Sequence, residues 1–386
     1  MKQDNGDPLR SAQRFTHTDY PTAEQAIEGA SFIIADWINE NEIVRDRMRS
    51  SFFEHGVITA KVVKTKKEEA DKYRDYFDFG QRIKNCPSYR LLAILRGVDE
   101  GFLRMKIEPN KEYALTWLNR FFIKNSNDAS AIVETAIKDA YKRLLQPALE
   151  TETKNHFKGL ADDQSITTFS RNLEKLILAP PIGSKRVLAI DPGFKSGCKV
   201  VCLDESGNLL HNCNIYPHPP QKETGKASAK ISQLVQTYKI EAIAIGDGTA
   251  GRETERFIKH IRFDRDLNVF VVREDGASIY SASKIAREEF PQFDVTVRGA
   301  VSIGRRLMDP LAELVKIDPK SLGVGQYQHD VNQTKLQKQL DHVVLTAVNR
   351  VGVNLNTASK YLLAYVAGLG PKLAENIVEW RKENGQ

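Results

Sequence analysis

Residues 187–190 (VLAI), followed by Asp191, Pro192 and Gly193, constrain the fold more than any other stretch of this 386-residue chain. A short apolar run is typical of a buried strand, and the Pro-Gly pair ends it in a turn. In open α/β sheets, ligands bind at the carboxyl ends of the strands. The acid at this strand end is therefore the first candidate for a functional side chain.

The hydrophobic period changes at a linker over residues 179–184, which contains two prolines, a glycine and a serine. After the linker, alternation and apolar runs predict strands at 187–190, 198–203, 209–216, 242–245 and 269–272. Helices are expected at 227–238 and 253–261, between the later strands. This β-β-β-α-β-α-β order, with acids at two strand ends, is the order of an RNase H-like fold.

Most of the remaining chain shows helical spacing, and Thr22 with Gln25 three residues later is typical of a capping box. A Ser cap is expected at Ser88, and residues 97–107 predict a short hairpin. The predicted helices lie at 22–38, 43–53, 88–95, 111–123, 128–145, 162–177, 281–289, 300–306, 310–314, 334–348, 357–367 and 373–383.

Composition excludes several classes of protein. Charged residues make up 27% and hydrophobic residues 41%, which is typical of a folded soluble protein. No apolar run approaches the roughly 20 residues of a membrane span, and the polar start lacks the features of a secretory signal. The four cysteines show no paired spacing. We expect a cytoplasmic protein that has no membrane partner.

A basic segment with interleaved aromatic residues is the first candidate nucleic-acid site. Residues 58–111 hold 13 Lys and Arg against 8 Asp and Glu, in a chain of net charge +6. The candidate contacts are Lys64, Lys66, Lys67, Lys72 and Arg74. Cations could hold phosphates while the aromatic rings stack on bases. The alternative is that the rings are ordinary core and the cations a solvated face.

Three acids are candidates for a metal site. Nucleases of the RNase H-like class hold two Mg²⁺ between converging carboxylates at strand ends and on one helix. Asp191, Asp247 and Asp309 could supply them. The alternative is that Asp191 caps its own turn and that Asp309, before Pro310, is an ordinary helix cap. The sequence requires no cofactor unless these acids bind Mg²⁺.

A glycine turn near the end of the chain is the second candidate for nucleic-acid binding. Gly368 and Gly370 could let backbone N–H groups approach a phosphate, and Lys372 adds a positive charge. Contacts of this kind are independent of base sequence. The alternative is a plain turn between two helices.

Five separated motifs together resemble the Tex family of bacterial transcription accessory proteins: residues 72–78 (KYRDYFD), 191–194 (DPGF), 248–250 (GTA), 325–330 (GQYQHD) and 356–359 (NTAS). The resemblance implies a helical N-terminal part with helix-turn-helix elements, a YqgF-type RNase H-like domain, helix-hairpin-helix motifs and a C-terminal OB-fold RNA-binding domain. In that family Asn is usual at the position of Asp247. On this resemblance we expect a shortened or atypical member that stops before the OB-fold.

The expected fold class is a multidomain α plus α/β protein. The expected parts are a partial helical domain (1–56), a central helical region (57–183), the RNase H-like domain (184–315) and an incomplete helix-hairpin-helix region (316–386). Three functions remain open: a non-catalytic scaffold that binds RNA or DNA of any sequence, a Mg²⁺-dependent nuclease or resolvase, and a platform that docks RNA polymerase or transcription factors.

Overall fold

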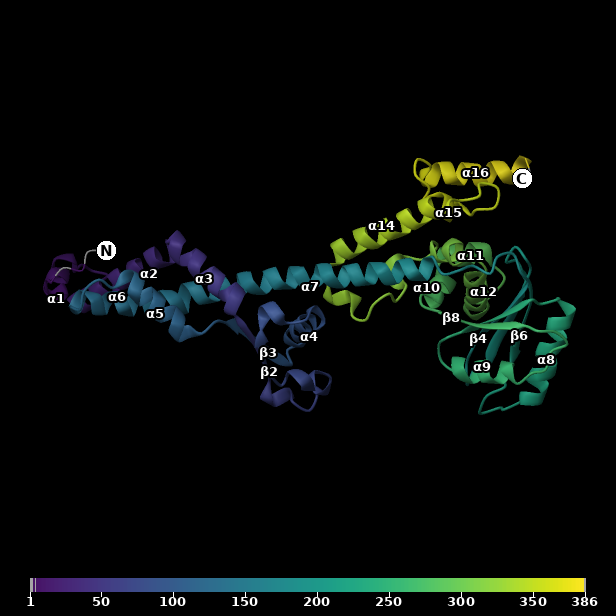
Figure 1. The fold of residues 1–386 in the computed structure, drawn as a ribbon, viewed down its shortest axis with the longest axis horizontal. Coiled ribbons are helices and arrows are strands. Elements are labelled where there is room, and N and C mark those ends of the chain that lie inside the picture. The colour runs from purple at the N-terminus through teal and green to yellow at the C-terminus, as the bar shows by residue number, and fades with distance from the viewer. Residues whose placement is uncertain (1–2, 4, 385–386) are drawn as a thin grey trace. The chain divides into compact units, whose positions relative to one another are not determined.

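A computed structural model describes residue 3 and residues 5–384, and Figure 1 shows its helices and strands. The chain divides into two compact units, residues 1–165 and 166–386. We describe each unit by itself. Helix α7, Gln146–Ile177, begins in the first unit and ends in the second.

The first unit is mainly helical and contains one small antiparallel sheet. Its helices are α1 (Pro8–Ala12), α2 (Ala23–Glu40), α3 (Glu42–His55), α4 (Ser88–Asp99), α5 (Lys111–Phe122), α6 (Asp128–Asp139) and the start of α7. Its sheet has the order β2-β1-β3, from β1 (Val57–Val62), β2 (Asp78–Arg82) and β3 (Leu103–Glu108). Apolar residues of α2, α3, α5, α6 and α7 form its main core, which includes Ile38, Phe52, Leu118, Ile137 and Leu149.

Local capping confirms the predicted start of α2. The Thr22 side chain accepts from the Gln25 N–H, and the Gln25 side chain bonds the Thr22 N–H in return, which forms a capping box. The cap predicted at Ser88 is wrong, because Pro87 occupies the cap position and makes no side-chain bond there.

One prediction was wrong and another was incomplete, because long-range pairing or a continuous helix replaced the local structure that was expected. Residues 97–107 form no hairpin of their own, because β3 pairs antiparallel with β1. The paired residues, such as Val57 and Glu108, are more than 40 positions apart in the sequence. The helices expected at 128–145 and 162–177 are joined by a π-helical turn, Ala140–Leu145, that leads into α7. Pro147 has no N–H to bond the carbonyl of Arg143, so a regular α-helical pattern cannot continue there.

The second unit contains a five-stranded mixed sheet of order β6-β5-β4-β7-β8. Its strands are β4 (Val187–Asp191), β5 (Cys198–Leu203), β6 (Leu209–Ile215), β7 (Ala242–Gly246) and β8 (Asn268–Val272). β4 pairs antiparallel with β5 and parallel with β7, and β7 pairs parallel with β8. The carboxyl ends of β4, β7 and β8 therefore lie at the same edge of the sheet, as the RNase H-like order predicts.

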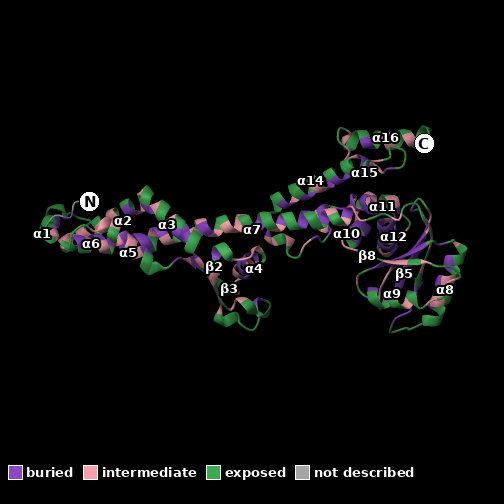
Figure 2. Cartoon of the chain, in the orientation of Figure 1, coloured by how far each residue is buried: buried purple, intermediate pink, exposed green. Residues whose placement is uncertain are grey.

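Side-chain alternation along β4 divides the core into two layers. Leu188 and Ile190 pack on one face with α8 (Thr224–Thr237) and α9 (Gly251–Lys259). Val187 and Ala189 pack on the other face against α12 (Val295–Met308). Figure 2 shows α12 and the central strands as the buried centre of this unit. Both faces of β4 are covered, which explains its unbroken apolar sequence.

Short helices and a helical C-terminal part complete the second unit. They are α10 (Ala277–Ala282), α11 (Lys284–Glu289), α13 (Pro310–Leu314), α14 (Gln333–Val351), α15 (Lys360–Leu363) and α16 (Gly370–Asn384). The helix predicted at 357–367 is confined to α15. Within the described part of the chain, no helix is both long and apolar enough to cross a membrane.

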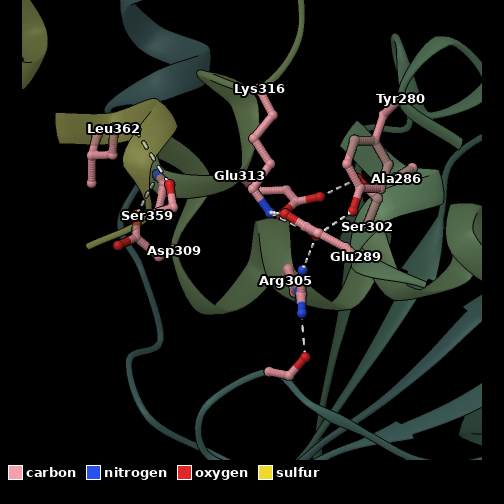
Figure 3. Close-up of polar contacts among 12 residues, drawn as sticks. Tyr280, Ala286, Glu289, Ser302, Arg305, Asp309, Glu313, Lys316, Ser359 and Leu362 are labelled. Carbon is pink, nitrogen blue, oxygen red and sulfur yellow. Dashed lines mark hydrogen bonds and ion pairs between the residues drawn. The ribbon is translucent and has the colours of Figure 1, made fainter. Parts of the chain in front are cut away.

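A buried ionic cluster links residues of α10, α11 and α13 to α12 (Figure 3). Glu289 accepts from the Tyr280 hydroxyl at 2.7 Å and pairs with Arg305 at 2.6 Å and Lys316 at 2.9 Å. Lys316 also pairs with Glu313 at 2.9 Å, and the Glu313 side chain is only 2% exposed. Because each charge has a partner, the cluster can remain ionised in the interior.

Candidate functional site

Asp191 lies at the carboxyl end of β4 and is largely buried. Burial raises its pKa to about 6, the negative charge of Glu274 adds to the rise, and the Lys199 charge opposes it. Lys199 is the residue opposite Asp191 in the antiparallel ladder with β5. Asp191 and Glu274 line a cavity of about 290 Å³, together with residues of α10 and α12.

Glu274 is the acid that the sequence analysis missed. It lies two residues beyond the end of β8. Gly246 and Gly248 make room for it, because a Cβ atom at either position would overlap the Glu274 carboxylate. Burial and the neighbouring Asp247 raise the pKa of Glu274. The signal that could have found it was the predicted strand at 269–272, whose carboxyl end belongs at the same sheet edge as Asp191.

Asp247 follows β7 and is exposed at this edge. Its Oδ1 accepts a hydrogen bond from the Glu274 N–H at 3.0 Å, which ties the ends of β7 and β8 together. The structure therefore brings Asp247 close to Glu274, and Glu274 close to Asp191.

Asp309 does not join these acids. It caps α13 by accepting from the Ala312 N–H at 3.0 Å, as the alternative interpretation predicted. It lines a different cavity, with the β5–β6 turn at Gly207 and with Gly183 before β4. Those residues lie at the opposite end of β4 from Asp191, so the three-acid set of Asp191, Asp247 and Asp309 is not assembled.

The helix that contacts Asp191 is α12, and it contains no Asp or Glu. Gly299 of this helix lies close to Asp191, because a Cβ atom built at Gly299 would be 3.5 Å from Asp191 Oδ2. No three His, Cys, Asp or Glu side chains in the described residues are grouped so that they could hold a metal ion. Two-metal cleavage needs three or four converging carboxylates, and this arrangement lacks the one from the helix.

The two glycines of the candidate hairpin have backbone conformations that favour glycine. Gly368, in the turn between α15 and α16, has a φ angle of 86°, and Gly370, the first residue of α16, has a φ angle of 65°. No atom lies within 4 Å of a Cβ built at either position. The glycines therefore serve backbone conformation and leave open space outside the turn. Lys372 is exposed in the first turn of α16, where the first N–H groups of a helix have no carbonyl partner within the helix.

The cations of the basic segment in the first unit differ in whether an ion pair with an acid holds them among the described residues. Lys64, Lys66 and Lys67 are exposed in and beside a short 3₁₀ helix that follows β1. Lys72 pairs with Glu100 at 2.6 Å, and Arg74 pairs with Asp71 at 2.8 Å. The first three are the stronger candidates for phosphate contacts, because the other two already have acidic partners.

The aromatic residues of this segment are partly core. Tyr73 is 2% exposed, and Tyr76, Phe77 and Phe79 are half-buried. Lys66 and Lys72 lie over the Phe102 ring at 5.4 and 5.9 Å. The burial of Tyr73 therefore agrees with the alternative that the aromatic rings are ordinary core.

Three family models match consecutive parts of the chain. A Tex central region-like model matches residues 3–169, a Tex protein YqgF-like domain matches residues 185–308, and a helix-hairpin-helix motif matches residues 348–386. The chain belongs to the Tex family. Family membership confirms the fold class: a helical region, an RNase H-like α/β domain and a helix-hairpin-helix.

Named relatives agree with this assignment. The transcriptional accessory protein Tex of Neisseria gonorrhoeae is 42% identical over 387 residues, which cover 97% of this chain and 50% of that protein. The uncharacterized protein YdcI of Bacillus subtilis is 47% identical over 95% of this chain and 51% of its own length. Human S1 RNA-binding domain-containing protein 1 is 36% identical over 92% of this chain and 38% of its length. The chain spans about half the length of its bacterial relatives.

Proposed function

We propose that this Tex-family chain is a nucleic-acid-binding scaffold of transcription that binds RNA or DNA of any sequence and does not cleave it. The single observation that supports this most is the exposed turn at Gly368 and Gly370, inside the segment that matches a helix-hairpin-helix motif. Backbone N–H groups at such a turn and at the start of α16 can bond phosphate oxygens without reading a base.

A substitution in the turn tests this proposal. Gly370→Asp places a side chain on a backbone with φ of 65° and sets a negative charge where the phosphate would lie. We expect about tenfold weaker binding to duplex DNA and to single-stranded RNA of several sequences, measured by fluorescence anisotropy. The matched control is Gly225→Asp, which adds the same charge in open space in the first turn of α8. Equal affinities for the two variants would remove the hairpin from the interface.

Salt dependence gives a second measurement on the same interface. Lys372→Gln should reduce the slope of log affinity against log salt by about 1, since one phosphate contact is lost. An unchanged slope would place Lys372 outside the interface. The same comparison for Lys64→Gln and Lys67→Gln tests whether the first unit also contacts the backbone.

Absence of cleavage is part of the proposal and has its own test. The proposal is supported by α12, which contains no acid beside Asp191. Incubation of labelled DNA and RNA with Mg²⁺ or Mn²⁺ should leave both intact. Cleavage that Asp191→Asn abolishes while binding persists would instead favour a Mg²⁺-dependent nuclease.

The partner proposal concerns RNA polymerase. A relative with 42% identity is named a transcriptional accessory protein, and we propose that this chain also associates with polymerase or its factors, in the cytoplasm. All four cysteines are free, which suits a reducing compartment. Co-purification of polymerase with the tagged chain, after nuclease treatment, is the expected result. A clean pull-down without polymerase would contradict the partner proposal and leave nucleic-acid binding untouched.

A further inference from the structure

A third cavity, of about 350 Å³, lies in the second unit where the C-terminal end of α7 meets β8, α12 and α13. Its walls are partly apolar and include Leu176, Leu307 and Leu314. Two exposed cations, Lys175 and Arg273, also line it. The cavity therefore combines an apolar interior with positive charge at its rim, and it shares no residue with the cavity at Asp191.

Arg306 lines the same cavity and is only 4% exposed. Its Nη1 donates to the carbonyl oxygens of Arg273 and Asp275 at 2.8 and 2.7 Å. Its Nε and Nη2 have no hydrogen-bond partner in the structure. Nε and Nη2 lie on one edge of the guanidinium, which is the edge that binds a carboxylate or a phosphate with two parallel hydrogen bonds.

Burial lowers the pKa of Arg306, and four acids lie close enough to oppose that shift: Glu313, Asp275, Glu274 and Asp247. Two of them have other cations as partners. Asp275 pairs with Arg273, and Glu313 pairs with Lys316. Lys175 makes no ion pair in the part of the chain described here. A buried cation with two unused donors is costly, because folding removes water from donors that nothing else bonds. An external acceptor is the missing component.

We propose that this cavity binds a small organic oxyanion, either a carboxylate or a phosphate monoester, whose apolar part packs against the leucines. Nε and Nη2 of Arg306 donate to the oxyanion, and Lys175 and Arg273 supply charge at the rim. Both nitrogens are buried, so ligand binding includes a small movement of the cavity wall. Arg is suited to this role because its rigid fork matches both oxyanions, whereas Lys acts only as a point charge.

Calorimetry and thermal unfolding of the whole chain test the proposal with three probes: inorganic phosphate, benzoate and adenosine monophosphate. We expect benzoate or adenosine monophosphate to bind and to raise the unfolding temperature by about 3 °C at tenfold excess over its Kd. The two organic probes distinguish a carboxylate from a phosphate ligand. Binding of inorganic phosphate alone would overturn the assignment of an organic ligand.

Variants connect binding to the residues. Arg306→Lys keeps the charge but removes the two-donor edge, so it should weaken binding more than tenfold. Lys175→Gln changes only an exposed side chain and should weaken binding several-fold. The matched control is Lys338→Gln on α14, which removes the same charge from an exposed position outside the cavity and should bind as the unmodified chain does. If the Arg306→Lys variant does not fold, the affinity of the Lys175→Gln variant, compared with that of Lys338→Gln, tests the proposal by itself.

Two further results would overturn the proposal. The first is that none of the three probes binds or shifts the unfolding temperature at about 10 mM, ten times a millimolar Kd. The second is that Lys175→Gln and any folded Arg306→Lys bind with the same affinity as Lys338→Gln.

Discussion

Replacing Asp191 with Asn should stabilise the second unit at neutral pH. The substitution keeps the shape of the side chain and removes a charge that burial disfavours. Asp191 makes no side-chain hydrogen bond in the described structure that Asn would have to replace. The effect should therefore come from the charge, which makes this residue a direct test of the electrostatics at the sheet edge.

The pKa gives the magnitude. Burial, with help from Glu274, raises the pKa of Asp191 from its ordinary 3.8 to about 6. A raised carboxyl pKa means that the ionised form weakens folding. The free-energy cost of folding with an ionised Asp191 is absent well below pH 4. It grows between about pH 4 and pH 6, the pKa values of the unfolded and folded states, and is constant above that. At about 1.4 kcal/mol per pKa unit, it reaches about 3 kcal/mol at pH 8 and about half of that at pH 5.

Differential scanning calorimetry at pH 5 and pH 8 checks both the size and the sign. For a unit of this length, about 3 kcal/mol corresponds to a rise of about 6–12 °C in the unfolding temperature. The control is Asp266→Asn, which removes the same charge from an exposed loop and should change little at either pH. A gain that is equal at the two pH values, or no gain at pH 8, would refute the account of a buried ionised carboxylate.

Three further substitutions test how the elements around the sites are held. Gly248→Ala places a Cβ atom against the Glu274 carboxylate and should cost about 1–3 kcal/mol of stability, measured by thermal unfolding. Lys316→Met leaves Glu313 buried without its cation and should cost about 3–5 kcal/mol by the same assay. Thr22→Ala removes the capping box of α2 and should cost about 1 kcal/mol, seen in the unfolding of the first unit.

Matched controls separate these effects from the substitutions themselves. Gly225→Ala adds a Cβ in open space, so it should not destabilise the chain as Gly248→Ala does. Lys226→Met breaks an exposed pair with Glu223, which should cost less than about 1 kcal/mol. If Lys316→Met costs no more than Lys226→Met, the buried cluster does not depend on that cation.

The sequence predicted the second unit well because both faces of its central strands are buried. A continuous apolar run such as that of β4 is typical of a strand whose sheet is covered on both faces. The predicted helices between and after the strands cover those faces. The errors arose where distant or continuous structure decides. The partner of β3 is β1, and no local pattern encodes a pairing at that separation.

The candidate site was predicted in part, for a related reason. Asp191 and Asp247 directly follow apolar strands, so their positions could be read from local pattern. Glu274 lies two residues past β8, and its position depends on the space left by Gly246, which ends β7, and by Gly248 just after it. Asp309 was misplaced because sequence spacing does not show that α12 runs from Asp191 to the opposite end of β4 before Asp309 begins the next helix.

The course of α12 also connects the fold to the proposed function. In a two-metal nuclease, the helix that crosses the first acid must present a further carboxylate there, but this helix presents Gly299 to Asp191. The charge on Asp191 is then a cost to folding that is offset only in part by Lys199. Nucleic-acid binding through the glycine turn before α16 needs none of these groups, since backbone N–H donors and Lys372 can hold a phosphate. Asp191→Asn should therefore change stability and its pH dependence while leaving affinity for nucleic acid unchanged.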